Sequence, residues 1–90
     1  MSTRLRLGIC NQKGLHARAS AKFVETVERF DAAAWVSRAG IRVAGDSIMG
    51  LLTLAAAIGT EIEIETDGPE AARLADALRG LVESGFGEPN

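Results

Sequence analysis

Hydrophobic and polar residues alternate in three segments of the chain, as they do in strands that have one buried face. The first segment is residues 3–10, where every second residue from Leu5 to Ile9 is apolar. The second is residues 33–44, which alternate on both sides of a glycine-containing turn and therefore predict a hairpin. The third is residues 60–66, where isoleucine alternates with glutamate. The alternation therefore predicts four strands.

Helical spacing of apolar residues separates these strands. The first predicted helix runs from residue 16 or 17 to 29, after a turn-forming sequence. Ser47 is an N-cap candidate for a short second helix that reaches Ala55, and Pro69 and Glu70 suit the first turn of a third helix. The order β-α-β-β-α-β-α, with one apolar stripe per helix, predicts an α+β fold: a two-layer sandwich with all helices on one face.

Length and composition narrow the class of protein. Ninety residues predict a single domain, with a core at about residues 3–85 and frayed last residues. Ten basic and twelve acidic residues leave a net charge of -2, which argues against bulk binding of nucleic acid or membranes. The start of the chain lacks the apolar core of a signal peptide, so we expect a cytoplasmic protein. The single cysteine, Cys10, excludes an internal disulfide, and we expect it either to pack or to occupy a neutral strand position.

The candidate chemistry lies where the first turn ends and the first helix begins. The only histidine, His16, falls at this point, and Arg18 follows two residues later. The first N–H groups of a helix lack internal partners and carry the positive end of its dipole, so they can bind an anion. Imidazole is a nucleophile near neutral pH, and a guanidinium can bind phosphoryl oxygens. A single histidine at this position is also an ordinary surface or capping residue, so the spacing alone leaves both interpretations open.

Three blocks of sequence resemble HPr, the histidine phosphocarrier family of the bacterial phosphotransferase system. Residues 14–18, followed by an apolar helix, are similar to the active-site segment of that family. Residues 47–54 are similar to its regulatory-serine helix, and residues 59–64 to its fourth strand. The resemblance covers about residues 3–85 in the same element order. It implies an open-faced sandwich in which three helices cover one face of a four-stranded antiparallel sheet.

The resemblance also implies a function and a site. His16 would accept a phosphoryl group on Nδ1 from phosphorylated enzyme I and pass it to an EIIA protein or domain. The backbone of Ala17, Arg18 and Ala19 would bind the phosphate, and the Arg18 side chain would neutralise its charge. The family acts as a monomeric carrier rather than an enzyme and uses no cofactor or metal. Many members have proline at the position of Ala19, and alanine should serve as well because it favours helix.

Partner docking is expected at the second helix and beside the histidine. The resemblance assigns it to Met49, Leu51 and Ser20, with Met49 as the best candidate for an exposed contact. The alternative is that Leu51 and Leu52 belong to the core and Met49 fills a gap.

The resemblance leaves two questions open. Ser47 would be a target of HPr kinase/phosphorylase, which makes a purely regulatory paralogue acting through Ser47 the alternative function. The preceding residue is Asp46, where the family commonly has lysine or asparagine, and an N-cap role for Ser47 needs no kinase. Residues 54–57 and 84–88 look closer to the nitrogen-related NPr branch than to the sugar-transport branch.

An RNA-binding module of the ferredoxin-like type is the rival with a similar element order. Such a module stacks bases on exposed aromatic residues and carries a basic face. This chain has three Phe, one Trp and no Tyr, and its last predicted strand presents Glu61, Glu63 and Glu65 outward. The composition therefore argues against RNA binding, and the glutamates are expected to form a solvated row rather than a metal site.

Overall fold

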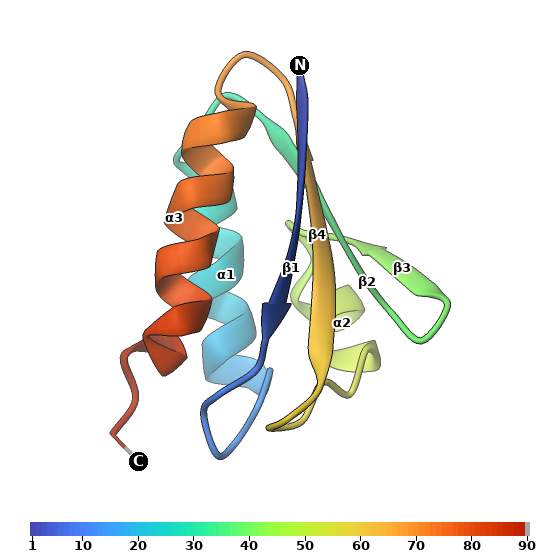
Figure 1. Cartoon of the computed structure of the whole chain (residues 1–90), viewed down its shortest axis with the longest axis vertical. Helices are drawn as coiled ribbons and strands as arrows, with labels where there is room; N and C mark the ends of the chain where they lie inside the picture. Colours follow the sequence, from blue (N-terminus) through green and yellow to red (C-terminus); the bar gives the residue numbers. More distant parts are fainter. Residues whose placement is uncertain (90) are drawn as a thin grey trace.

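The computed structural model describes residues 1–89, and its elements follow the predicted order (Figure 1). No helix in this part of the chain has the length and hydropathy needed to cross a membrane. The elements are β1 Ser2–Gly8, α1 Ala17–Glu28, β2 Ala33–Arg38, β3 Ile41–Ala44, α2 Ile48–Thr53, β4 Glu61–Asp67, α3 Ala71–Glu83 and a final 3-10 turn, η1, Gly85–Gly87.

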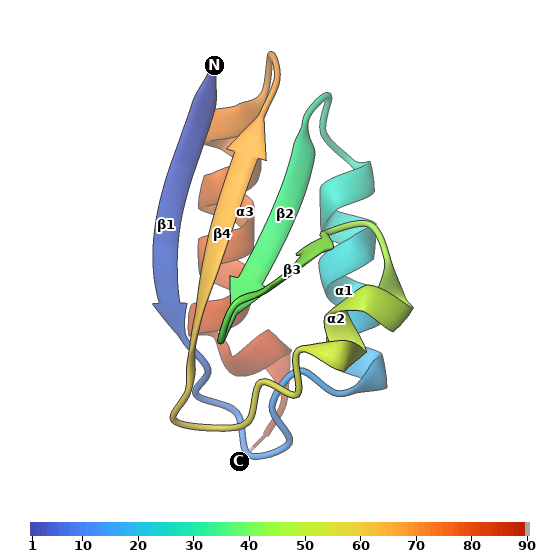
Figure 2. The ribbon, with the colours of Figure 1, turned by 90° about the vertical axis from the view of Figure 1, so that its right-hand side faces the viewer.

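The four strands form one antiparallel sheet in the order β1-β4-β2-β3. β4 lies between the first strand and the hairpin, so the segment at residues 61–67 joins the two ends of the sheet. Figure 2 shows the strands in front of α1 and α3, which cover one face of the sheet. The shorter α2 packs against α1 and β3. This arrangement has two layers and leaves the other face of the sheet open.

The core lies between the sheet and the helices and follows the alternation in the sequence. Residues of β1 and β4 alternate between buried and exposed, so each strand presents one apolar face to the helices. The apolar stripes of α1 and α3 face the same layer. Each large side chain buried here contributes about 1.5–3 kcal/mol relative to exposure. The largest fully buried apolar residues are Phe23, Val36, Leu51, Leu54, Ile62, Ile64, Leu74, Leu78, Val82 and Phe86.

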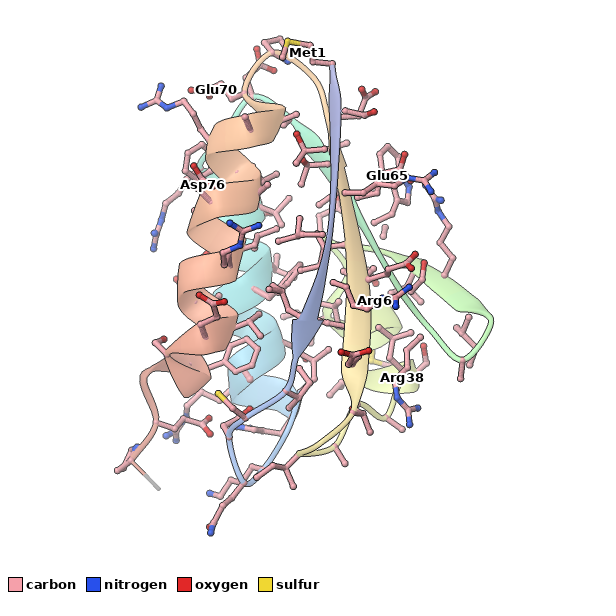
Figure 3. All side chains as sticks on the ribbon, viewed as in Figure 1. Met1, Arg6, Arg38, Glu65, Glu70 and Asp76 are labelled. Carbon is pink, nitrogen blue, oxygen red and sulfur yellow. The ribbon has the colours of Figure 1, made fainter. Side chains whose placement is uncertain are left out.

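The open face of the sheet carries paired charges. Arg6 donates to Glu63 at 3.0 Å, and Glu65 lies 3.1 Å from Arg42. Figure 3 shows Arg6 and Glu65 on the side of the sheet away from α3. The Arg42 guanidinium also lies over the Trp35 ring, 5.1 Å from its centroid. Two members of the predicted row, Glu63 and Glu65, are therefore ion-paired on a solvent-exposed surface, where such pairs add little stability.

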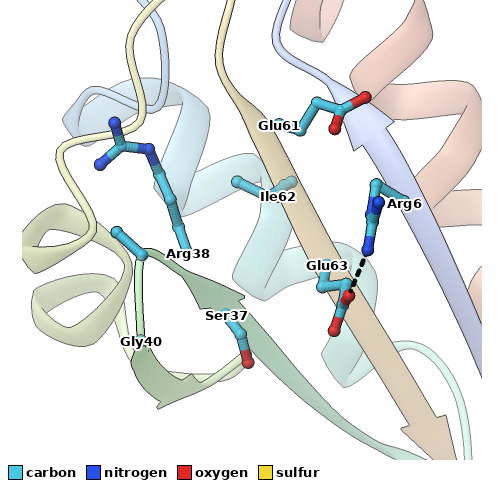
Figure 4. A pocket seen from close by; sticks show the side chains of 8 residues that line it. Arg6, Ser37, Arg38, Gly40, Glu61, Ile62 and Glu63 are labelled. Atoms are coloured by element: carbon cyan, nitrogen blue, oxygen red, sulfur yellow. Dashed lines mark hydrogen bonds and ion pairs between the residues drawn. The ribbon is translucent and has the colours of Figure 1, made fainter.

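A hollow of about 390 Å³ lies on the same face (Figure 4). Arg6, Ser37, Arg38 and the glutamates of β4 line it. Arg6 is already paired with Glu63, and the Arg38 guanidinium donates to the Leu54 carbonyl at 3.0 Å. Both arginines in this hollow therefore already bind acceptors of the protein itself.

Two element boundaries differ from the sequence-based prediction. The second helix ends at Thr53 rather than at Ala55, because Ala55 adopts a left-handed backbone with φ 49°. The third helix begins at Ala71, with Glu70 as its N-cap residue rather than in its first turn. Both differences lie at helix ends, where local tertiary contacts decide the boundary.

The predicted fraying after residue 85 is wrong for the next three residues. Phe86 is completely buried, and Lys22 Nζ donates to its carbonyl oxygen at 2.6 Å. Cys10, which is exposed rather than packed, donates from its thiol to the carbonyl oxygen of Val82 at 3.4 Å. These contacts hold the end of the chain against the loop that precedes α1.

Candidate functional site

The loop before α1 is held by contacts that only glycine permits. Gly14 has φ +62°, and a Cβ atom at this position would lie 2.4 Å from the Ala56 carbonyl oxygen. The neighbouring Leu15 N–H donates to that same oxygen at 2.9 Å, and Leu15 is buried. The buried Asn11 side chain donates to the Gly14 carbonyl at 2.9 Å. The backbone at Gly14 therefore lies directly against Ala56, and these contacts hold the loop that leads into α1.

His16 is the N-cap residue of α1. Its backbone is extended, with φ -76° and ψ -177°, and its side chain makes no capping hydrogen bond. Its carbonyl oxygen accepts the first helical bond, from Ser20 N–H at 2.8 Å. The residues that follow, Ala17, Arg18 and Ala19, form the first turn, whose N–H groups have no partner within the helix. The imidazole therefore stands beside the positive end of α1.

Glu88 completes this site and could not be anticipated from the sequence pattern. Its carboxylate contacts His16 Nε2, and its other oxygen accepts from Asn11 Nδ2 at 3.0 Å. The hydrogen bond from Asn11 is the main cause that lowers the pKa of Glu88 below its ordinary value. His16 and Lys13 act in the same direction, against partial burial. Glu88 is therefore ionised at neutral pH and can only accept hydrogen bonds.

Two hollows border the imidazole. One, of about 190 Å³, is lined by His16, Arg18 and Glu88 together with Gln12, Lys13 and Pro89. The other, of about 310 Å³, lies between Lys13, His16 and the segment at residues 55–57. Two cationic side chains and a helix start thus surround the ring, which is 26% exposed. This arrangement suits a small anion that is approached from solvent.

The start of α2 has different chemistry. Ser47 is its N-cap residue, and the hydroxyl oxygen accepts from Gly50 N–H at 3.0 Å. The predicted capping role of Ser47 is therefore confirmed. Gly50 is also close to Val43, since a Cβ atom on this glycine would lie 3.1 Å from the Val43 Cβ. Asp46, just before the cap, is exposed.

The docking residues expected from the sequence separate into exposed and buried ones. Met49 is 74% exposed and forms, with Ile48 and Leu52, an exposed group that we call the α2 patch. The docking predictions for Leu51 and Ser20 are wrong, because both are completely buried, and the alternative that placed Leu51 in the core is confirmed. Leu51 is the residue through which α2 enters the core, and the Ser20 hydroxyl donates to the Leu15 carbonyl at 3.2 Å. Leu52, expected in the core as the alternative, is exposed instead.

Known structures share this fold over nearly the whole chain. The crystal structure of HPr-C-His from Thermoanaerobacter tengcongensis superimposes with a TM-score of 0.93 at 34% sequence identity, covering 98% of this chain and 99% of that one. The predicted architecture of four antiparallel strands and three helices is therefore confirmed.

The sequence comparisons agree with the structural one. The family described as "PTS HPr component phosphorylation site" matches residues 4–84. Phosphocarrier protein HPr of Neisseria meningitidis is 52% identical over 80 residues, which are 89% of this chain and 90% of that protein. Phosphocarrier protein NPr of Escherichia coli K12 is 34% identical over 89 residues, 98% of this chain and 99% of that protein. The chain belongs to the HPr family of the phosphotransferase system.

Proposed function

We propose that this protein carries a phosphoryl group on His16, taking it from phosphorylated enzyme I and giving it to an EIIA protein or domain. The observation that carries the proposal is the position of the imidazole at the uncapped start of α1, between two hollows that Lys13 borders. Family membership supports the same relay. The protein would act as a carrier in the cytoplasm, as a monomer.

The transfer needs little covalent chemistry from the protein. The lone pair of His16 Nδ1 forms the new N–P bond, while the bond to the donor breaks and its electron pair stays with the donor. Arg18 and the amides of Ala17, Arg18 and Ala19 would stabilise the charge on the phosphoryl oxygens. One guanidinium and a helix start hold the group without enclosing it, so a second protein can remove it.

The shape of the site favours a carrier over an autonomous enzyme. The hollow that contains both His16 and Arg18 is about 190 Å³, below the volume of about 300–1,000 Å³ that is usual for small-molecule sites. The larger hollow of about 310 Å³ contains His16 without Arg18. An exposed nucleophile on a rigid helix end can be shared by two partner proteins in turn. The α2 patch, with Met49 most exposed, would supply the apolar part of both interfaces.

Phosphorylation of Ser47 is a second proposed activity, and it rests on the position of this residue. Ser47 is half-buried directly before the α2 patch, and its hydroxyl oxygen accepts a hydrogen bond without needing to donate one. A kinase of the HPr kinase/phosphorylase type would place a doubly charged group beside Met49. Such a charge would weaken docking of an apolar surface, so Ser47 would regulate the relay.

The relay is tested by following the phosphoryl group through both steps. The protein is incubated with phosphoenolpyruvate, Mg²⁺ and enzyme I from the same organism, and its intact mass is measured at neutral pH. We expect one added phosphoryl group, lost in acid as a phosphohistidine is, and lost also when an EIIA protein is added. Sugar-type and nitrogen-type EIIA proteins are tested side by side, because relatives named HPr and NPr both match. A folded protein that stays unlabelled would refute the relay.

A further inference from the structure

The segment at residues 85–88 folds back toward His16. Gly85, Phe86 and Gly87 all have left-handed backbones, with φ of 66°, 58° and 69°. A left-handed conformation costs a bulky residue such as Phe86 about 1–2 kcal/mol, and complete burial of its ring offsets that cost. The turn reverses the chain after α3 and brings Glu88 to the start of α1.

Asn11 joins this tail to the histidine loop. Its buried Nδ2 donates to two acceptors, the Gly14 carbonyl at 2.9 Å and Glu88 Oε1 at 3.0 Å. Rotating the amide by half a turn would place its oxygen against both acceptors, so the two bonds fix its orientation. Among the described residues, Asn11 Oδ1 is buried without a hydrogen-bond partner. Holding the Glu88 carboxylate therefore leaves the buried Asn11 Oδ1 without a hydrogen bond, which is energetically unfavourable.

We propose that Glu88 is a positioning residue that selects which nitrogen of His16 is phosphorylated, an inference that rests on the proposed function. A carboxylate can only accept, so its contact with Nε2 requires that Nε2 carry the proton. The lone pair is then on Nδ1, away from Glu88. The same contact fixes the rotation of the ring. It also covers Nε2, because the end of the chain at Glu88 lies on that side of the ring.

Glu88 would keep its contact with His16 while the phosphoryl group is transferred. When Nδ1 forms its bond to phosphorus, the Nε2 proton stays in place and the ring becomes a phosphorylated imidazolium. The Glu88 charge, 14% exposed, lies against that proton and balances the new positive charge. Arg18 and Lys13 border the hollow beside the ring, so they could bind the phosphoryl oxygens once Nδ1 has reacted. Glu88 would then balance the charge of the ring, and the two cations the charge of the phosphoryl group.

Phosphoramidate tests this role without any partner protein. This small donor transfers its phosphoryl group to an imidazole nitrogen and releases ammonia, which takes the electron pair of the broken P–N bond. The two phosphohistidine isomers are separated by ³¹P and ¹⁵N NMR, and the protein has only one histidine. For the unmodified protein we expect Nδ1 to be favoured by at least about tenfold, as a charge-assisted hydrogen bond at Nε2 allows.

Three variants separate positioning from a structural role. Glu88→Ala should bring the isomer ratio to within about threefold of unity, since the charged hydrogen bond is gone. Glu88→Gln keeps the size of the side chain and one accepting oxygen, so it should give an intermediate ratio. Glu83→Gln removes the same charge from an exposed site on α3 and should leave the ratio unchanged. Circular dichroism of each variant confirms that it is folded.

Two results would overturn the inference. An unchanged isomer ratio in Glu88→Ala would show that Glu88 does not select the nitrogen. A faster reaction at Nδ1 in that variant would show that the tail is a cover over the site rather than a support for the ring. Both results can be obtained without enzyme I, so they do not depend on the relay. If enzyme I fails to phosphorylate the protein while phosphoramidate still reacts selectively at Nδ1, only the proposed function is refuted.

Discussion

α1 and α2 both begin with backbone N–H groups that lack partners within the helix, but only α2 caps them with a side chain. Each helix begins with an extended residue followed by N–H groups that lack internal partners. At α2, the Ser47 hydroxyl accepts from Gly50 N–H, so the chain satisfies its own helix end. At α1, His16 makes no such bond, and its ring instead contacts the tail. A helix end closed by its own cap stabilises the fold, whereas one left open can receive an anion.

The difference fits the support that each helix has. α1 is 12 residues long and buries six of them, so packing holds it without a side-chain cap. α2 has six residues and buries only Leu51, so its first turn depends on Ser47. The longer helix can therefore leave its start open for chemistry, and the shorter one cannot.

The largest expected effect comes from removing the proposed nucleophile, His16, at the open start of α1. His16→Ala should abolish phosphoryl acceptance from enzyme I, because the chain has no other histidine. The free energy of unfolding should fall by only about 1 kcal/mol, since the ring caps nothing and is not in the core, and the contact with Glu88 is what the fold loses. Urea unfolding and intact-mass measurement check the two parts. A folded variant that still gains an acid-labile group would place the chemistry elsewhere.

A smaller effect is expected from the cation beside the ring. Arg18→Ala should slow phosphoryl acceptance about tenfold without stopping it, because one charge-assisted contact to the phosphoryl oxygens is lost. Arg29→Ala removes an exposed arginine at the other end of α1 and serves as the matched control. Rapid-quench kinetics measures both rates. Equal rates in the two variants would remove Arg18 from the site.

The closed start of α2 should respond in stability rather than in chemistry. Ser47→Ala should lower the free energy of unfolding by about 1 kcal/mol through loss of the cap, while its reaction with phosphoramidate stays unchanged. Ser47→Asp keeps a capping oxygen, so it should restore most of that stability but weaken binding to enzyme I by its charge. Urea unfolding and surface plasmon resonance separate the two effects. Unaltered binding in Ser47→Asp would leave Ser47 as a cap alone.

The smallest expected effect is a pH dependence of stability that arises from Glu88, at the start of α1. The hydrogen bond from Asn11, with help from His16, lowers the pKa of Glu88 in the folded state below its ordinary value of 4.5. The ionised form is therefore favoured by folding, and its stabilisation is present above pH 4.5 and lost as the pH falls through the lowered pKa. The melting temperatures of the unmodified protein and Glu88→Gln should thus converge in acid. A constant gap for Glu88→Gln across this pH range would contradict the assignment.

The sequence was sufficient for features that depend on local signals. Alternation located the strands, and a serine before an apolar run located the cap of α2. A six-residue helix is too short for the spacing of its apolar residues to decide which of Leu51 and Leu52 is buried. The sequence therefore left both docking and a core position open for Leu51, and its alternative placed Leu52 in the core as well, where only Leu51 lies. The placement of Ser20 failed for a related reason, because a small polar residue can satisfy its hydroxyl inside the fold.

The role of the tail could not be predicted from local rules. A phenylalanine between two glycines near the end of a chain usually indicates flexibility, since glycine favours many conformations. Here the left-handed backbone of Phe86 is held by burial of its ring, and Glu88 reaches a residue 72 positions earlier in the chain. Only the packed structure brings the carboxylate, Asn11 and His16 together.

The most direct test of the central claim is to locate the phosphoryl group after incubation with phosphoenolpyruvate and enzyme I. Fragmentation mass spectrometry at neutral pH assigns the added group to a residue, and brief acid treatment distinguishes phosphohistidine from phosphoserine. We expect one acid-labile group on His16 at the open start of α1 and none on Ser47. An acid-stable group on Ser47, with His16 unmodified in the folded protein, would contradict it.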